Sequence, residues 1–104
     1  MSYQNQSALV IGAGISGFAA AKYLAAAGAR VTLSDAKEEA DAEKDAVTQK
    51  HIEALRTQGI SCVFGAQREE LIEGTDLIVL SPAVPERIPL VQAARVRGIR
   101  VTTE

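Results

Sequence analysis

The sequence predicts an α/β domain with a Rossmann-like open parallel sheet of about five strands and helices on both faces. Three observations favour this class. Short apolar runs alternate with segments of helical character, which is typical of a parallel sheet with right-handed crossovers. Hydrophobic residues make up 47% of the chain, enough for a packed core. A length of 104 residues suits one domain, so we expect residues 1–104 to form a single unit.

Five short runs rich in aliphatic and β-branched residues are the expected strands. The first and the fourth are continuously apolar, as expected for strands that are covered on both faces. Fold statistics favour the strand order 3-2-1-4-5, an order that the sequence alone does not determine. The expected strands are residues 8–11, 31–34, 60–64, 77–80 and 99–102.

Three longer segments between these runs are expected to be helices, because each ends at a glycine. The first covers residues 16–27, where the alanines at 19–21 form a small face that can lie close to a sheet. The second covers residues 48–58 and has Thr48 as its N-cap. The last covers residues 88–97.

The stretch from Lys37 to Lys50 differs from its surroundings, with five acidic residues against three lysines and little apolar content. A solvated loop or an exposed helical extension is one interpretation, and an acidic arm that binds a partner is the other. Residues 68–72 are expected to form at most one or two helical turns.

Composition and charge exclude several classes of function. A net charge of −2 leaves no basic surface that could neutralise nucleic-acid phosphates, so we expect no nucleic-acid partner. Residues 1–7 lack the basic segment of a signal peptide. Lys22 and the closely spaced glycines argue against a membrane span in the apolar region 8–29. We therefore expect a cytoplasmic protein without a membrane partner.

The single cysteine and the single histidine indicate no metal site. Cys62 has no second cysteine to pair with, and no Cys/His cluster surrounds it in the sequence, so we interpret it as a small buried side chain of a strand. This cysteine usage is typical of a reducing compartment. His51 lies on a polar stretch and is interpreted as a surface residue.

The strongest local motif is a GxGxxG formed by Gly12, Gly14 and Gly17. It follows an apolar strand and opens a helix, and Asp35 ends the next strand at the spacing of a dinucleotide-type fingerprint. In such a loop the first glycine permits a tight turn, the second lets a phosphate approach the backbone, and the third allows close helix–strand packing. The motif predicts a nucleotide-type ligand, with a purely structural glycine turn as the alternative.

A second motif, Ser81-Pro82-Ala83-Val84-Pro85, directly follows the fourth strand. In a 3-2-1-4-5 sheet the first and fourth strands are neighbours, and their connections leave toward opposite faces. We therefore expect this segment and the glycine loop to face each other across one cleft; the alternative is a loop that is merely stiffened by proline. The sequence contains no Ser/His/Asp set and no GxxxxGK[ST] phosphate loop, so we expect the chain to bind rather than to catalyse, with no catalytic residue of its own.

At these motifs the chain resembles the Mur ligases, in particular those that add D-glutamate. The resemblance covers nearly the whole chain except the acidic segment, and it is carried by residues 10–21, 31–35, 80–85, 89–90, 93–94 and 98–99. It implies a three-domain, ATP-dependent amide-bond-forming enzyme of peptidoglycan synthesis, with this chain as the first domain. It also implies partners in the enzyme's own central and C-terminal domains, and ATP and Mg²⁺ as cofactors of the whole enzyme, with none in this domain. The isolated domain would be inactive.

The resemblance further implies a UDP-binding role for this domain, with UDP-N-acetylmuramoyl-L-alanine as the bound partner. The backbone around the helix start would meet the diphosphate, the residues after the second strand would surround the uracil, and the Ser-Pro segment would line the opposite wall. Ala83 replaces a usual glycine, and Ala36 lacks a hydroxyl that some relatives carry. The implied UDP-binding residues are Gly14, Ile15, Ser16, Gly17, Asp35, Ala36, Lys37, Ser81, Pro82 and Ala83.

Two other functions stay open on the sequence alone. An NAD(P)-binding Rossmann module of a dehydrogenase or a regulatory protein would carry the same glycine loop. A non-binding interaction domain would bind no nucleotide at all.

Overall fold

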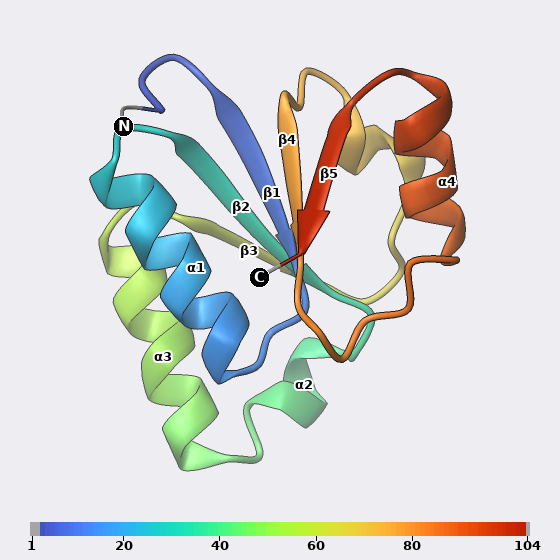
Figure 1. Cartoon of the computed structure of the whole chain (residues 1–104). Coiled ribbons are helices and arrows are strands. Elements are labelled where there is room, and N and C mark those ends of the chain that lie inside the picture. Colours follow the sequence, from blue (N-terminus) through green and yellow to red (C-terminus); the bar gives the residue numbers. More distant parts are fainter. Residues whose placement is uncertain (1–2, 104) are drawn as a thin grey trace.

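A five-stranded parallel sheet forms the centre of the computed structural model, which describes residues 3–103 (Figure 1). Met1, Ser2 and Glu104, which the expected domain of residues 1–104 includes, lie outside the described residues. The strand order is β3-β2-β1-β4-β5, as predicted. The strands are β1 (Ser7–Ile11), β2 (Arg30–Asp35), β3 (Ser61–Phe64), β4 (Leu77–Leu80) and β5 (Arg100–Thr103).

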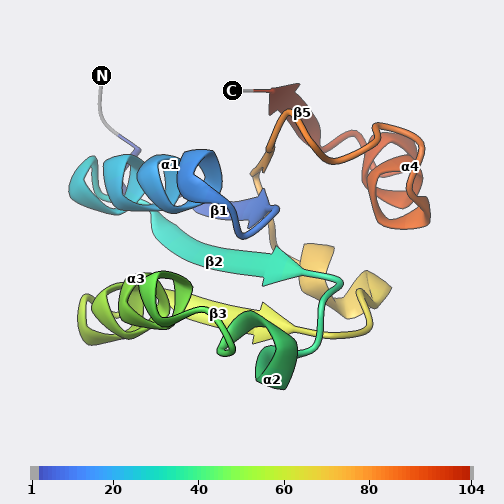
Figure 2. The same cartoon turned by 90° about the horizontal axis from the view of Figure 1, so that it is seen from below.

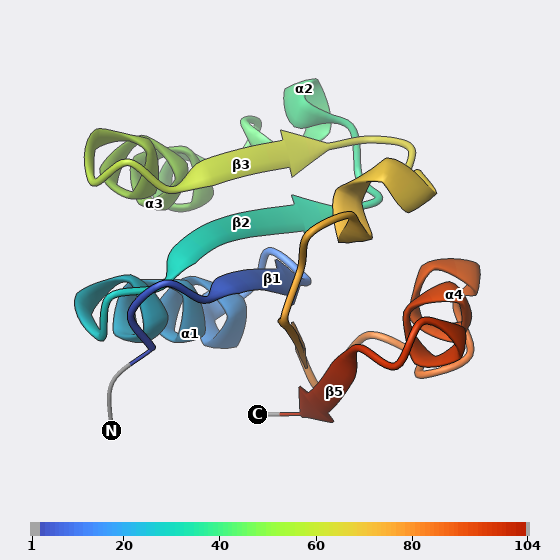
Figure 3. The same ribbon diagram turned by 90° about the horizontal axis from the view of Figure 1, so that it is seen from above.

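Helices cover both faces of the sheet, again as predicted. Figures 2 and 3 show α1 and α3 on one side of the strands and α4 on the other. The helical elements are α1 (Ile15–Ala26), α2 (Glu39–Ala42), α3 (Ala46–Thr57), the 3-10 helix η1 (Glu69–Ile72) and α4 (Pro89–Val96). The elements α1, α3, η1 and α4 differ from their expected bounds by only a few residues, and a glycine follows shortly after α1, α3 and α4, as expected. No separate helix was expected at the position of α2.

Two apolar clusters, one on each face, hold the layers together. On one face Phe18 and Leu24 of α1 and Ile52 of α3 pack against β1 and β2. On the other face Leu90 and Val91 of α4 pack against alternate residues of β1 and β4. Because consecutive residues of β1 and β4 enter opposite clusters, all of β4 and residues 8–11 of β1 are buried, which explains their continuous apolar sequence.

The buried side of α1 differs from the expected alanine face. Ala21 is buried, but Ala19 is exposed and Ala20 is only half-buried. Three consecutive residues span most of a helix turn, so they cannot all face the sheet. Phe18 and Leu24 complete the buried side together with Ala21.

The start of α3 also differs from the prediction. The N-cap is Asp45 and not Thr48, because the Asp45 carboxylate accepts a hydrogen bond from the backbone amide of Val47 at 3.0 Å. Thr48 lies inside the first turn, where its hydroxyl donates to the same carboxylate at 3.1 Å. Both residue types favour N-cap positions, so sequence preference alone did not separate them.

The acidic segment is mostly helical. It contains α2 and the first turn of α3, and Ala42 of α2 is buried in the core. Arg56 of α3 donates a hydrogen bond to the Glu39 carboxylate of α2. It donates a second hydrogen bond to the backbone oxygen of Cys62, at 3.1 Å. The hydrogen bond to Glu39 raises the pKa of the Arg56 guanidinium. The acidic segment is therefore a helical extension rather than a solvated loop, and partner binding by it stays a hypothesis.

His51 and Cys62 both lie partly inside the molecule. The His51 ring is half-buried and stacks on Phe18, with ring centroids 4.9 Å apart, so its interpretation as a surface residue was wrong. Cys62 is half-buried and packs against the core, and this burial raises the pKa of its thiol. Within residues 3–103, no helix is long and apolar enough to cross a membrane.

Candidate functional site

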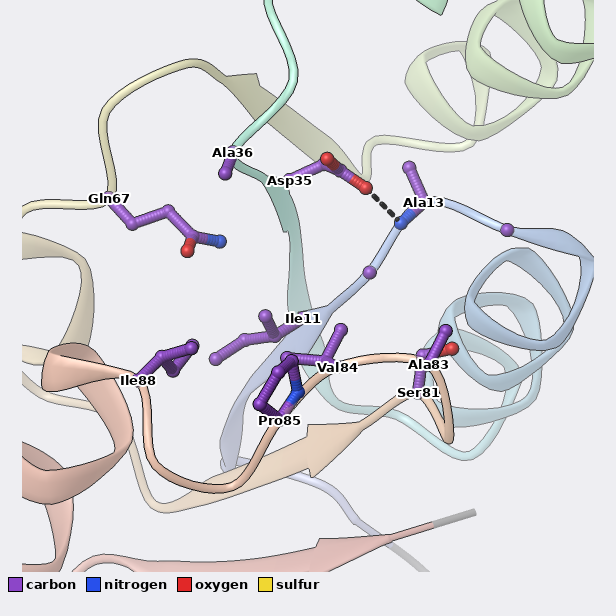
Figure 4. A pocket seen from close by; sticks show the side chains of 12 residues that line it. Ile11, Ala13, Asp35, Ala36, Gln67, Ser81, Ala83, Val84, Pro85 and Ile88 are labelled. Carbon is purple, nitrogen blue, oxygen red and sulfur yellow. Dashed lines mark hydrogen bonds between the residues drawn. The ribbon is translucent and has the colours of Figure 1, made fainter.

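A cavity of about 420 Å³ opens at the carboxyl ends of the central strands. The glycine loop after β1 lines one side and the Ser81 segment after β4 lines the other, as predicted from the strand order (Figure 4). This is the topological switch point, where open α/β sheets bind their ligands. The lining residues are Ile11, Gly12, Ala13, Gly14, Asp35, Ala36, Gln67, Ser81, Ala83, Val84, Pro85 and Ile88.

The protein's own packing requires two of the three motif glycines. Gly12 has a φ of +112°, and a Cβ there would lie 2.6 Å from the Cβ of Ser81. A Cβ on Gly17 would lie 1.9 Å from the backbone oxygen of Gly12. Both positions therefore exclude any side chain, the first because the two cavity loops touch and the second because the helix packs on the loop.

Gly14 differs, because a Cβ there would meet no atom within 4 Å. Its backbone is extended, with φ −106° and ψ −174°, a conformation open to any residue. The space beside Gly14 belongs to the cavity. No contact within residues 3–103 thus accounts for a glycine here, whereas the approach of a ligand to the backbone would.

The start of α1 offers free backbone amides at the same place. The first intrahelical bond runs from the amide of Phe18 to the oxygen of Gly14 at 2.9 Å, so the amides of Ile15, Ser16 and Gly17 precede it. No side chain caps this end, and the first turn carries no acidic residue. Such an uncapped helix start has the positive potential and the donors that bind anionic groups such as phosphates.

The carboxylate of Asp35 joins the end of β2 to the glycine loop. It accepts a hydrogen bond from the backbone amide of Ala13 at 2.8 Å (Figure 4). It accepts a second from the backbone amide of Lys37, also at 2.8 Å. Asp35 is thus a structural tether of the loop. Each of its oxygens also keeps a lone pair that a ligand donor can reach.

The Ser81 segment forms a tight turn against the loop. The amide of Ser81 donates to the backbone oxygen of Ile11 at 3.0 Å, and the amide of Val84 returns to the oxygen of Ser81 at 2.9 Å. Pro82 occupies the second position of this turn, where its fixed φ is favourable. Ser81 is only 7% exposed, whereas Ala83 and Pro85 are exposed at the cavity wall.

Half of the residues expected at the site line the cavity. They are Gly14, Asp35, Ala36, Ser81 and Ala83. The other five are not among the lining residues: Ile15, Ser16, Gly17, Lys37 and Pro82. For the three residues of α1 the expected contact is through backbone amides.

Some lining residues lie outside both motifs: Gln67 comes from the loop after β3, and Ile88 from the segment that leads into α4. Val84 and Pro85 belong to the second motif, although they were not among the implied binding residues. The parallel topology contained a signal for Gln67, because the carboxyl end of the third strand meets the same edge of the sheet as the first two. The apolar wall had no sequence signal that distinguishes it from ordinary core residues.

The cavity offers an apolar surface with a few polar groups and no cluster of metal ligands among the described residues. Its walls are mainly apolar, with Asp35, Gln67 and Ser81 as polar side chains. Within residues 3–103, no three His, Cys, Asp or Glu side chains lie close enough together to hold a metal ion. The sequence also lacks a GxxxxGK[ST] loop for the phosphates of ATP, so neither a metal cluster nor an ATP phosphate loop is found among these residues.

Comparison with known proteins is consistent with these features. A family profile described as "Mur ligase MurD-like, N-terminal domain" matches residues 6–103. The chain is 38% identical over 101 residues to the UDP-N-acetylmuramoylalanine--D-glutamate ligase of Exiguobacterium sibiricum. It is 36% identical over the same length to the ligase of that name from Staphylococcus aureus strain MW2. Each alignment covers 97% of this chain and 21% of the relative, so the chain spans about a fifth of the length of these curated relatives.

Solved structures with the same fold include a ligase and a dehydrogenase. The UDP-N-acetylmuramate-alanine ligase of Thermotoga maritima matches 94% of this chain and 20% of its own, with a TM-score of 0.70 and 22% identity. The shikimate dehydrogenase of Aquifex aeolicus matches 98% of this chain and 43% of its own, with a TM-score of 0.62 and 20% identity. At such identities these likenesses establish the fold alone.

The sequence motifs that resemble the Mur ligases lie in the matched region, around the cavity between the glycine loop and the Ser81 segment. Because the family profile extends over nearly all of the chain, the chain belongs to the family of MurD-like Mur ligase N-terminal domains.

Proposed function

We propose that this chain binds the uridine diphosphate part of UDP-N-acetylmuramoyl-L-alanine, as the N-terminal domain of a ligase that joins D-glutamate to that substrate. The family and the printed names of the relatives support the substrate class. The observation that carries the proposal is Gly14, whose missing side chain leaves space in the cavity that no described contact within the protein requires.

The diphosphate is placed at the start of α1 in this proposal. The backbone amides of Ile15, Ser16 and Gly17 supply donors, and Gly14 allows the phosphate to come close. No Lys or Arg is among the described lining residues, so the helix end is the main attraction for the negative charge. Lys37 lies just outside the cavity and is exposed.

The nucleoside is placed deeper in the cavity. Asp35 and Ala36 line it on the side of β2, and Ser81 and Ala83 line the opposite wall, with Lys37 and Pro82 beside them in the chain. Since Ala36 has no hydroxyl, any polar contact from it comes from its backbone. Asp35 contributes in two ways, by holding the loop and by offering its remaining lone pairs to the ligand.

The chemistry of the proposed ligase needs more than this chain. ATP with Mg²⁺ would activate the substrate carboxylate, and D-glutamate would then attack to form the amide. We place that chemistry on the central and C-terminal domains of the longer relatives, and assign binding to residues 1–104. The single half-buried cysteine fits the cytoplasmic location that such a ligase would have.

A titration separates this proposal from its alternatives. We expect UDP to shift the backbone amide NMR signals of residues 14–17, 35–37 and 81–83 in ¹⁵N-labelled protein, and NAD to shift them less at the same concentration. Shifts of the glycine loop with NAD alone would favour a dehydrogenase-type module. An unchanged spectrum with both ligands at millimolar concentration would favour an interaction domain without a nucleotide.

A further inference from the structure

Gln67 places a side-chain amide in the wall of the cavity at a defined position. It follows β3 and is half-buried, and its Nε2 donates to the hydroxyl of Ser34 at 3.1 Å. Ser34 is only 1% exposed, and its backbone oxygen accepts from the amide of Gly12 at 2.8 Å. One residue of β2 thus holds both the glycine loop and Gln67, which sets the position of the amide relative to the loop.

The bond to Ser34 leaves two groups of this amide unused. Nε2 carries two hydrogens, of which Ser34 takes one, and within residues 3–103 no donor to Oε1 is found. A free N–H beside a free oxygen in one plane is complementary to a group that carries a carbonyl beside an N–H. Uracil is such a group, because its N3–H lies between two carbonyls.

The surroundings of Gln67 suit a planar base. Ile11, Val84 and Ile88 line the same part of the cavity and can pack on the faces of a ring while its polar edge meets the amide. Figure 4 shows Gln67 at the end of the cavity opposite Ala13, with Asp35 between the two. A diphosphate held at the start of α1 would therefore leave the base at the end where Gln67 lies.

We propose that Gln67, positioned by Ser34, recognises the uracil by two hydrogen bonds, from Nε2–H to a ring carbonyl and from N3–H to Oε1. This inference rests on the proposed binding of a uridine nucleotide. Gln67 is then the side chain that distinguishes uracil from a base without a donor at N3.

The test compares UDP with N3-methyl-UDP, in which a methyl group replaces the hydrogen on N3. Dissociation constants are measured by NMR titration for the wild-type chain and for Gln67→Leu, which keeps the side-chain size and removes the amide. We expect wild type to bind N3-methyl-UDP about 3- to 10-fold more weakly than UDP, from the loss of a hydrogen bond. In Gln67→Leu the two ligands should bind with nearly equal affinity.

Two further variants sharpen this result. Gln49→Leu changes an exposed glutamine of α3 outside the cavity, and it should retain the wild-type preference for UDP. Ser34→Ala removes the hydrogen-bond partner of Gln67 and should reduce the preference, because the amide is no longer held.

The outcomes separate this inference from the function on which it rests. If UDP binds and Gln67→Leu keeps the full preference over N3-methyl-UDP, Gln67 does not recognise the base, although the proposed function stands. If Gln67→Leu weakens both ligands equally, the residue acts only on the structure of the cavity, and the inference is again wrong. If wild type binds no UDP, both the inference and the proposed function are wrong.

Discussion

The three motif glycines differ in what a side chain would meet. Gly12 and Gly17 are required by contacts within the protein, whereas a Cβ on Gly14, which lines the cavity, would meet no atom within 4 Å. A sequence pattern cannot make this distinction, because all three positions read as glycine. The coordinates around each missing Cβ make it directly.

The variants Gly14→Ala and Gly17→Ala should therefore behave differently. Gly14→Ala should lower the free energy of unfolding by less than about 1 kcal/mol, the scale of an N-cap change from glycine to alanine. It should also abolish UDP binding. Gly17→Ala should lower the free energy of unfolding by about 3 kcal/mol or more, because the helix must move off the loop. Urea unfolding and a UDP titration measure both quantities, and UDP binding by Gly14→Ala at wild-type affinity would contradict the assigned role.

Asp35 combines a structural and a proposed ligand-binding role. Replacing it by alanine leaves the amides of Ala13 and Lys37 without their acceptor. We expect Asp35→Ala to lower the free energy of unfolding by about 1–3 kcal/mol and to weaken UDP binding. Denaturant unfolding of the variant without ligand checks the first effect. An unchanged free energy would mean that the two hydrogen bonds contribute nothing, and unchanged UDP affinity in the folded variant would exclude the ligand contact.

At the scale of elements, helix ends show where sequence reasoning succeeds and where it stops. The glycines after α1, α3 and α4 predicted their ends, because glycine has a specific conformational role there. The start of α3 was misplaced, because Asp45 and Thr48 are both good N-cap residues and lie three positions apart. The hydrogen bond from Val47 to Asp45 decides between them, and only the structure shows it.

Asp45→Ala tests this N-cap. The variant should lower the free energy of unfolding by about 1 kcal/mol, since the first turn of α3 loses the acceptor for Val47. Asp41→Ala is a matched control, because Asp41 makes an exposed ion pair with Lys44 at 3.0 Å, and such pairs contribute little. Urea unfolding of both variants gives the comparison. A larger loss from Asp41→Ala than from Asp45→Ala would be inconsistent with the assigned cap.

For the whole molecule, the sheet was the most predictable feature. The alternation of strands and helices predicted a parallel sheet, and fold statistics supplied the order β3-β2-β1-β4-β5, which brings the glycine loop and the Ser81 segment to one cavity. Gln67 was not predicted, because the contact of a single loop side chain depends on how that loop folds back over β2. His51 was misplaced for a similar reason, since its stacking on Phe18 depends on the packing of α3 against α1.

The charge of the whole molecule makes a prediction about salt. The chain has a net charge of −2, and the described lining of the cavity has no basic side chain. UDP binding should therefore weaken by no more than about twofold between about 20 and 300 mM NaCl, because little long-range attraction is there to be screened. Titrations at the two salt concentrations measure this. A tenfold weakening would indicate a basic residue on the diphosphate, and Lys37→Gln would then identify whether Lys37 is that residue.

The hydrogen bond between Asp35 and Ala13 has a kinetic consequence. Because β2 already holds the glycine loop in the free protein, a ligand finds the loop in its binding conformation and need not wait for it to order. Association is then expected in a single step whose observed rate rises linearly with ligand concentration. A variant that loses this hydrogen bond should associate with the nucleotide more slowly, because fewer molecules have the glycine loop in its binding conformation at any time. The dissociation rate of the bound nucleotide should change less.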